Sequence, residues 1–132
     1  MITRKQISVE ARDTYVITSI QSSGIADRVV GIIPTRSQLV KVYEVHGSVA
    51  GQAGTLAVER LQSTETPSTG DHVVIGIDLT AAVDTVQEGT ILTTSSMHLF
   101  EAGDRVGTHV NSGSAASCAN MVVCLQFRPV DA

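Results

Sequence analysis

The feature that most constrains the fold of this chain is the alternation of apolar and polar residues over short segments. The clearest case is the segment 120–130, in which the alternation ends at Pro129. In an extended chain, one face of this segment carries four large apolar side chains, those of Met121, Val123, Leu125 and Phe127. Because successive side chains of a β-strand point to opposite faces, this period of two predicts a strand with one buried face.

Similar patterns predict about eight short strands along the whole chain. They cover the segments 14–20, 27–34, 39–49, 54–62, 72–79, 91–100, 104–110 and 120–130. Turn-forming residues recur about every 8–12 positions, which is typical of a β-sandwich or a β-barrel. Only the segment 80–90 could hold a helical turn, and Gly76 is a candidate β-bulge. The expected class is therefore all-β.

The alternation also assigns side chains to faces in two further segments. In the segment 14–20, one face carries Val16, Thr18 and Ile20 and the other carries Tyr15 and Ile17. In the segment 39–49, one face carries Leu39, Lys41, Tyr43 and Val45, and the other carries Val40, Val42, Glu44 and His46.

Length and charge limit the possible functions. At 132 residues the chain fits one domain, and a net charge of −4 offers no concentrated basic face for nucleic acid. Its apolar runs are far shorter than the roughly 20 residues of a membrane-spanning helix, and no apolar stretch typical of a signal peptide follows the first basic residues. Cys118 and Cys124 are expected to be free thiols, which suits a reducing cytoplasm.

The stretch "HLFEAGDRVGTHV", His98 to Val110, holds several polar side chains that could suggest a small active site. However, Gly103 can adopt the backbone angles of a tight turn, and Asp104 can accept a hydrogen bond from a nearby backbone amide. The stretch therefore predicts a turn between two strands, with Arg105 beginning the second strand.

Motifs of catalysis, metal binding and phosphate binding are missing from the sequence. The histidines at 46, 72, 98 and 109 lie far apart, without the spacing of zinc ligands, and are expected to be isolated surface residues. No nucleophile elbow and no P-loop occur, and the glycine-rich segment 46–54 favours a hairpin connection. Aromatic residues make up 3% of the chain, which disfavours a sugar-binding module. We expect no catalytic residue, no metal and no cofactor.

Residues 1–12 are net positive, because they contain Arg4, Lys5 and Arg12 against a single acidic residue, Glu10. The rest of the chain is net negative. One interpretation is a frayed, solvated terminus. The other is an extended N-terminal arm that binds an acidic neighbouring protein, followed by a single domain over 13–132. We take Arg4, Lys5 and Arg12 as candidate contact residues.

Four pieces of the chain, in this order, resemble a group of small proteins of tailed bacteriophages and prophages. They are "AVERL" (Ala57–Leu61), "IDLTAAVDTVQEGTIL" (Ile77–Leu92), "LFEAGDRV" (Leu99–Val106) and "MVVCLQFRPV" (Met121–Val130). The run that contains them covers about two-thirds of the chain. The chain departs from the group at "SAASCANM" (Ser114–Met121), where the group has small apolar residues.

The resemblance implies an eight-stranded antiparallel jelly-roll sandwich that decorates a phage head. It implies a structural virion protein that binds the outside of the capsid lattice and cements it, with the major capsid protein as partner. It implies no enzyme activity, and the chain would be assembled onto virions in the host cytoplasm. Homo-oligomers are expected, with a dimer favoured over a trimer because two-fold symmetry is the commonest.

Two loops complete the list of candidate contacts. Their residues are Thr66, Ser68, Asp71, Asn111 and Ser114. Two alternatives remain open at this point. One is a receptor- or glycan-binding β-module of a tail or fibre, and the other is a small jelly-roll enzyme.

Overall fold

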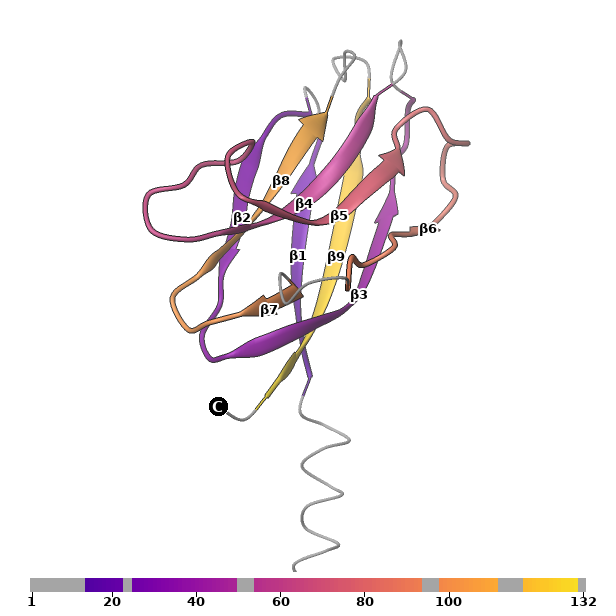
Figure 1. Ribbon diagram of the computed structural model, residues 1–132. Helices are drawn as coiled ribbons and strands as arrows, with labels where there is room; N and C mark the ends of the chain where they lie inside the picture. Colours follow the sequence, from indigo (N-terminus) through magenta and orange to yellow (C-terminus); the bar gives the residue numbers. More distant parts are fainter. Residues whose placement is uncertain (1–13, 23–24, 50–53, 94–97, 112–117, 131–132) are drawn as a thin grey trace, which may run out of the picture.

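The computed structural model describes residues 14–22, 25–49, 54–93, 98–111 and 118–130. The described residues form nine β-strands and no α-helix (Figure 1). The strands are β1 (Tyr15–Gln21), β2 (Arg28–Ile32), β3 (Ser37–Val45), β4 (Thr55–Leu61), β5 (Asp71–Asp78), β6 (Gln87–Glu88), β7 (Leu99–Phe100), β8 (Arg105–Asn111) and β9 (Met121–Pro129). The arm residues Arg4, Lys5 and Arg12, and the loop residue Ser114, lie outside the described residues.

The strands form two antiparallel sheets that pack face to face. Sheet A has the order β1-β9-β3-β6, with β7 also pairing with β3, and sheet B has the order β2-β8-β4-β5. With the two-residue strand β7 set aside, the first strand pairs with the last, the second with the seventh, the third with the sixth and the fourth with the fifth. This pairing is the connectivity of an eight-stranded jelly roll, so the predicted fold is confirmed.

The core lies between the sheets and is built from the faces that alternation predicts. On β9, the side chains of Met121, Val123, Leu125 and Phe127 are all fully buried. The Phe127 ring lies edge-on to Phe100, with ring centroids 5.3 Å apart, and stacks on Tyr15 at 5.4 Å. On β1 the inner and outer faces are also those predicted, since Val16 and Ile20 are exposed.

A β-bulge corrects the predicted faces of β3. The register of β3 against β9 shifts between Leu39 and Lys41. Leu39 is therefore buried together with Val42 and His46, although strict alternation put it on the opposite face. The bulge predicted at Gly76 is confirmed, because this residue has a φ of +80° and lies where the pairing of β5 with β4 shifts.

The connections between strands confirm one prediction and overturn two. The predicted turn at Glu101–Asp104 is present: Gly103 has a φ of +90°, and the Asp104 carboxylate accepts a hydrogen bond from the Glu101 amide at 2.8 Å. The segment 80–90 holds turns and β6 instead of a helical turn. The connection 46–54 is no hairpin, because β3 and β4 lie in different sheets. None of the described residues forms a helix that could span a membrane.

Candidate functional surfaces

One end of the sandwich is almost free of charge. The connections 22–26, 46–54, 79–86 and 112–120 begin and end there, and the structure describes 22, 25–26, 46–49, 54, 79–86 and 118–120 of them. Backbone hydrogen bonds link their described parts, for example from Gly47 to Ala119 at 2.9 Å and from Leu79 to Gly54 at 3.0 Å. Together they contain one charged residue, Asp84, whereas 17% of the whole chain is charged. Asp27 and Asp78 lie directly beside them, where Asp78 accepts hydrogen bonds from Thr80 and Asp27 accepts one from the Val110 amide. We call this surface the uncharged end.

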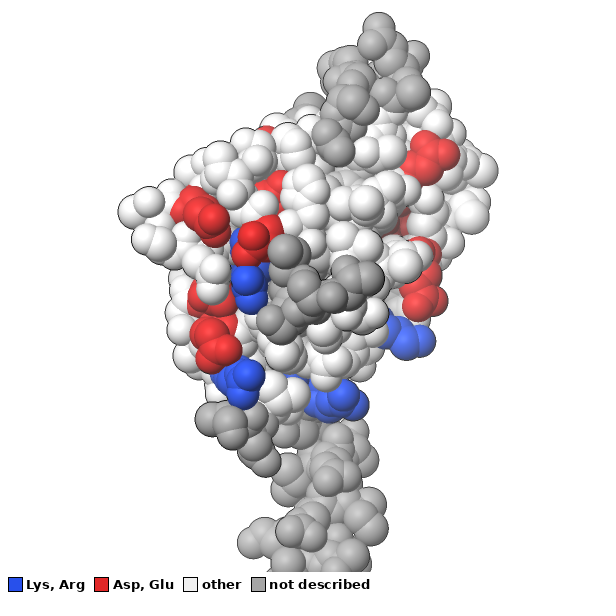
Figure 2. All heavy atoms as spheres, viewed as in Figure 1, with Lys and Arg blue, Asp and Glu red and all other residues white. Residues whose placement is uncertain are grey.

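The uncharged end also presents apolar side chains to solvent. Val83 and Val86 are 43% and 63% exposed, and Val49 is 39% exposed. On the face shown in Figure 2, lysine and arginine side chains gather towards the opposite end, where β1 begins. Because charged groups are costly to desolvate, the centres of protein interfaces are depleted in them. The uncharged end therefore has the chemistry of a protein-binding surface.

A buried ion pair holds the connection 79–86 onto sheet A. Nδ1 of His46 lies 2.7 Å from a carboxylate oxygen of Glu44, and Nε2 lies 2.8 Å from the carbonyl oxygen of Ala81. The second Glu44 oxygen accepts a hydrogen bond from Gln87 at 2.8 Å. Since both ring nitrogens of His46 face acceptors, the geometry favours the doubly protonated imidazolium.

The surroundings of His46 act on its pKa in opposite directions. Burial lowers the pKa of His46, but the hydrogen bonds to Glu44 and Ala81 and the charges of Glu44 and Asp78 outweigh it. The pKa of His46 therefore lies above its ordinary value of 6.5. The prediction that this histidine is an isolated surface residue is wrong, because its side chain is fully buried.

A second surface is formed by the connection 62–70, which folds back over the outer face of sheet B. The guanidinium of Arg105 donates hydrogen bonds to the carbonyl oxygens of Ser63 and Glu65, both at 2.8 Å. Pro67 packs near Gly107, where a Cβ atom would lie 3.3 Å from the proline Cγ and 2.8 Å from a methyl group of Leu61. We call the connection 62–70 and the side chains that anchor it the polar platform.

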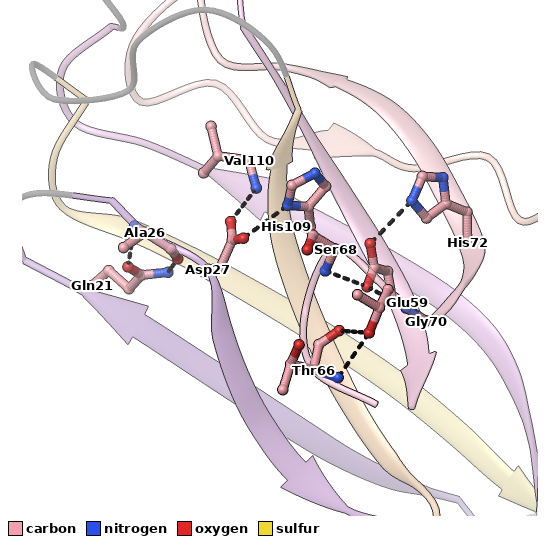
Figure 3. A network of polar contacts seen from close by, with 11 residues as sticks. Gln21, Ala26, Asp27, Glu59, Thr66, Ser68, Gly70, His72, His109 and Val110 are labelled. Atoms are coloured by element: carbon pink, nitrogen blue, oxygen red, sulfur yellow. Dashed lines mark hydrogen bonds and ion pairs between the residues drawn. The ribbon is translucent and has the colours of Figure 1, made fainter. Parts of the chain in front are cut away.

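The polar platform rests on a strip of two carboxylate–histidine pairs (Figure 3). Glu59, which is fully buried, accepts hydrogen bonds from the amides of Ser68 at 2.8 Å and Gly70 at 3.3 Å. Its other oxygen lies 3.0 Å from Nε2 of His72. The strip continues because the His72 ring stacks against the His109 ring, with centroids 6.3 Å apart.

Asp27 completes the strip from the segment before β2. One Asp27 oxygen lies 2.9 Å from Nδ1 of His109, and the other accepts a hydrogen bond from the Val110 amide at 2.8 Å. The prediction of isolated surface histidines is therefore wrong for His72 and His109 as well. Among the described residues, no group of three or more His, Cys, Asp or Glu side chains could hold a metal ion. The strip holds the connection 62–70 on sheet B.

The predicted contact residues fall on different parts of the molecule. Thr66 and Ser68 are exposed on the polar platform, whereas the Asp71 carboxylate beside them is paired with Arg60 at 2.8 Å. Asn111 is the last residue of β8 and lies at the uncharged end. It is separated from the platform end of β8 by roughly 20 Å of strand. The structure thus brings three of these residues together and places Asn111 away from them.

Comparison with known proteins gives matches in structure only. No protein-family model matches the chain, and no curated protein matches its sequence. A chain of the capsid of Ralstonia phage GP4 matches with a TM-score of 0.61 and 15% identity, over 90% of this chain and 84% of that one. A chain of the acid-stable capsid of Helicobacter pylori bacteriophage KHP30 matches with a TM-score of 0.55 and 12% identity, over 87% and 86%. These likenesses show that the chain shares the jelly-roll sandwich of those capsid chains.

Proposed function

We propose that this chain is a structural protein of a bacteriophage virion that binds the outside of the capsid lattice and stabilises it. The observation that carries the proposal is the fold likeness to the phage GP4 capsid chain, which extends over 90% of this chain and leaves little of either chain unmatched. The resemblance of four sequence pieces, in order, to small phage and prophage proteins supports the same assignment.

The uncharged end is the surface we assign to the capsid lattice. It exposes Val83 and Val86, and the connections that form it contain one charged residue, Asp84, with Asp27 and Asp78 beside them. Burying Val83 and Val86 removes apolar area from water while few charged side chains are desolvated. A protein that binds only the assembled lattice shifts the equilibrium towards the assembled state. Many copies of a modest contact then stabilise the whole particle, and no catalytic group is needed.

The N-terminal arm is the second contact in the proposal. Arg4, Lys5 and Arg12 would bind an acidic surface of a neighbouring capsid subunit. The arm precedes β1 and so starts at the end of the sandwich opposite the uncharged end. Twelve extended residues span at most about 40 Å, so the arm can contact a subunit other than the one that the uncharged end contacts.

Binding to capsids that lack this protein tests the proposal directly. Purified protein is added to such capsids, and the amount that co-sediments is measured together with the temperature at which the particles release DNA. We expect saturable binding and a higher release temperature. Protein that stays in the supernatant at saturating concentration would contradict the proposal.

A truncation distinguishes the contribution of the arm to capsid binding from the contribution of the uncharged end. A variant without residues 1–9 is expected to fold normally, because the described strands begin at Tyr15. It should bind capsids more weakly than the full chain. Unchanged binding would remove the arm from the proposal and leave the uncharged end as the contact.

A further inference from the structure

Strand β1 is an edge strand without the features that normally protect sheet edges. It pairs with β9 on one side, and no backbone hydrogen bond among the described residues reaches its other side. Natural proteins protect edges with charged residues, proline, bulges or very short strands. The seven residues of β1, Tyr-Val-Ile-Thr-Ser-Ile-Gln, include no charge, no proline and no glycine, and their pairing with β9 is regular throughout.

The other described edges are protected. β2 carries Arg28 and a register shift around Val30. β5 has two register shifts, and Ile91 forms a bridge with Val74 on its open side. β6 and β7 are two residues long each. β1 thus differs from every other edge in the described part of the sandwich.

The outer face of β1 is apolar as well. Ile20 is 69% exposed, which is the largest value among the exposed large apolar side chains described, and Val16 is 54% exposed. The strand register places Ile20 beside Val122, which in turn lies beside Val45, so an apolar row crosses sheet A. An uncharged, β-branched strand of this kind aggregates when it stays uncovered, so we expect it to have a specific partner.

We propose that two copies of this chain pair through their β1 strands, antiparallel, about a two-fold axis at Thr18. This register places Val16 opposite the partner's Ile20, and Ile20 opposite the partner's Val16. It overlaps all seven residues of both strands and keeps every side chain on its own face of the sheet. The apolar row on each sheet A then continues onto the partner, and the two sheets become one.

A second copy fits this edge better than the chain's own first residues. The contact is self-complementary, as a two-fold interface requires, and β1 carries no charge that would repel an identical strand. To cover its own β1, the segment 1–13 would have to reverse direction just before Tyr15. The residues there, from Glu10 to Thr14, include no glycine for a two-residue hairpin. This inference concerns the purified chain and does not depend on the proposed function.

Charge substitutions at Thr18 test both the edge and the register. Thr18 is exposed, so its replacement disturbs no core contact. The wild-type chain is expected to sediment at twice 13.9 kDa in the micromolar range. Thr18→Lys and Thr18→Glu each place like charges opposite one another and should raise the dissociation constant about tenfold or more. An equimolar mixture of the two variants should restore the dimer, because lysine then faces glutamate.

Two controls make the result specific. Ile75→Lys adds the same charge to an exposed apolar position on β5 and should leave the dimer intact. Deletion of residues 1–13 should also leave it intact. A monomeric wild-type chain, a dimer that survives Thr18→Lys, a mixture that stays monomeric, or a dimer lost on deletion of 1–13 would each overturn the proposal. Thermal unfolding checks that every variant is folded.

Discussion

Three side chains, those of Glu44, His46 and Glu59, are fully buried although a charged group is costly to take out of water. Each has hydrogen-bond or ion-pair partners that compensate part of this cost. Glu44 and His46 face each other, and Glu59 accepts two backbone amides and faces His72. His46 thereby holds the connection 79–86, and Glu59 holds the connection 62–70.

The sequence predicts that Glu44 and His46 share a face, but it does not predict the partners of His72 and His109. Alternation along the segment 39–49 already places Glu44 and His46 on the same face. The partners of the other two histidines lie on different segments: His109 meets Asp27 across 82 positions, and His72 meets Glu59 on the neighbouring strand. Alternation within one segment carries no information on which strands become neighbours, so these contacts could not be predicted.

The buried His46 predicts a specific pH dependence of stability. Because the pKa of His46 is raised in the folded chain, its contribution to stability is fully present below pH 6.5, the ordinary value. The contribution is lost as the pH rises above 6.5 through the folded-state pKa. The free energy of unfolding, measured by urea denaturation between pH 5 and about 9, should therefore fall over this range in the wild type.

The variant Glu44→Gln/His46→Gln is the matched control for that dependence. It removes both charges of the pair, so neither is left buried without a partner. Its free energy of unfolding should vary less with pH above 6.5 than that of the wild type. The same decline in both proteins would show that His46 is not the group responsible.

At the scale of elements, β-bulges and connections decide where the sequence-based prediction holds. The strands β1 and β9 are regular, and their buried faces follow from alternation alone. In β3 the bulge between Leu39 and Lys41 resets the alternation, and no local residue pattern marked it. The polar platform is an exposed loop, and it is compact because Glu59 and Arg105 bind its backbone.

Glu59→Ala tests how the polar platform is held. The substitution leaves the amides of Ser68 and Gly70 without their acceptor and removes the carboxylate that faces His72. We expect a loss of about 1–3 kcal/mol in the free energy of unfolding, since buried donors are left unpaired. Hydrogen exchange at these two amides should become faster.

Glu101→Ala serves as the comparison for that experiment. Glu101 forms an exposed ion pair with Arg36 at 3.0 Å, and such pairs contribute about 0–1 kcal/mol. Equal effects of the two substitutions on stability, or unchanged exchange at Ser68 and Gly70 in Glu59→Ala, would contradict the role given to Glu59.

At the scale of the whole molecule, charge is distributed unevenly along the sandwich. Four connections from distant parts of the sequence form the uncharged end, and only the jelly-roll connectivity brings them together. Each connection by itself reads as an ordinary loop of small residues. The sequence therefore predicted the fold, whereas the surface proposed to bind the capsid appears only once the strands are arranged.

Val86→Glu tests the uncharged end as the capsid-binding surface. Val86 is 63% exposed, so the substitution should leave the fold intact, but it places a charge where the contact would exclude water. We expect capsid affinity to fall about tenfold or more in a co-sedimentation titration. Ile32→Glu, at a β2 position that is 67% exposed at the other end, should bind like the wild type. Equal binding by both variants would exclude the uncharged end as the contact.

The most direct test of the central claim is the number of copies of this chain in each virion. Virions from the source of the chain are purified by density-gradient sedimentation, and the chain and the major capsid protein are quantified in the same particles. A cementing protein is predicted to be present in numbers comparable to the major capsid protein. A few copies per particle would point to a tail or a vertex, and absence from the particles would contradict a role in the virion.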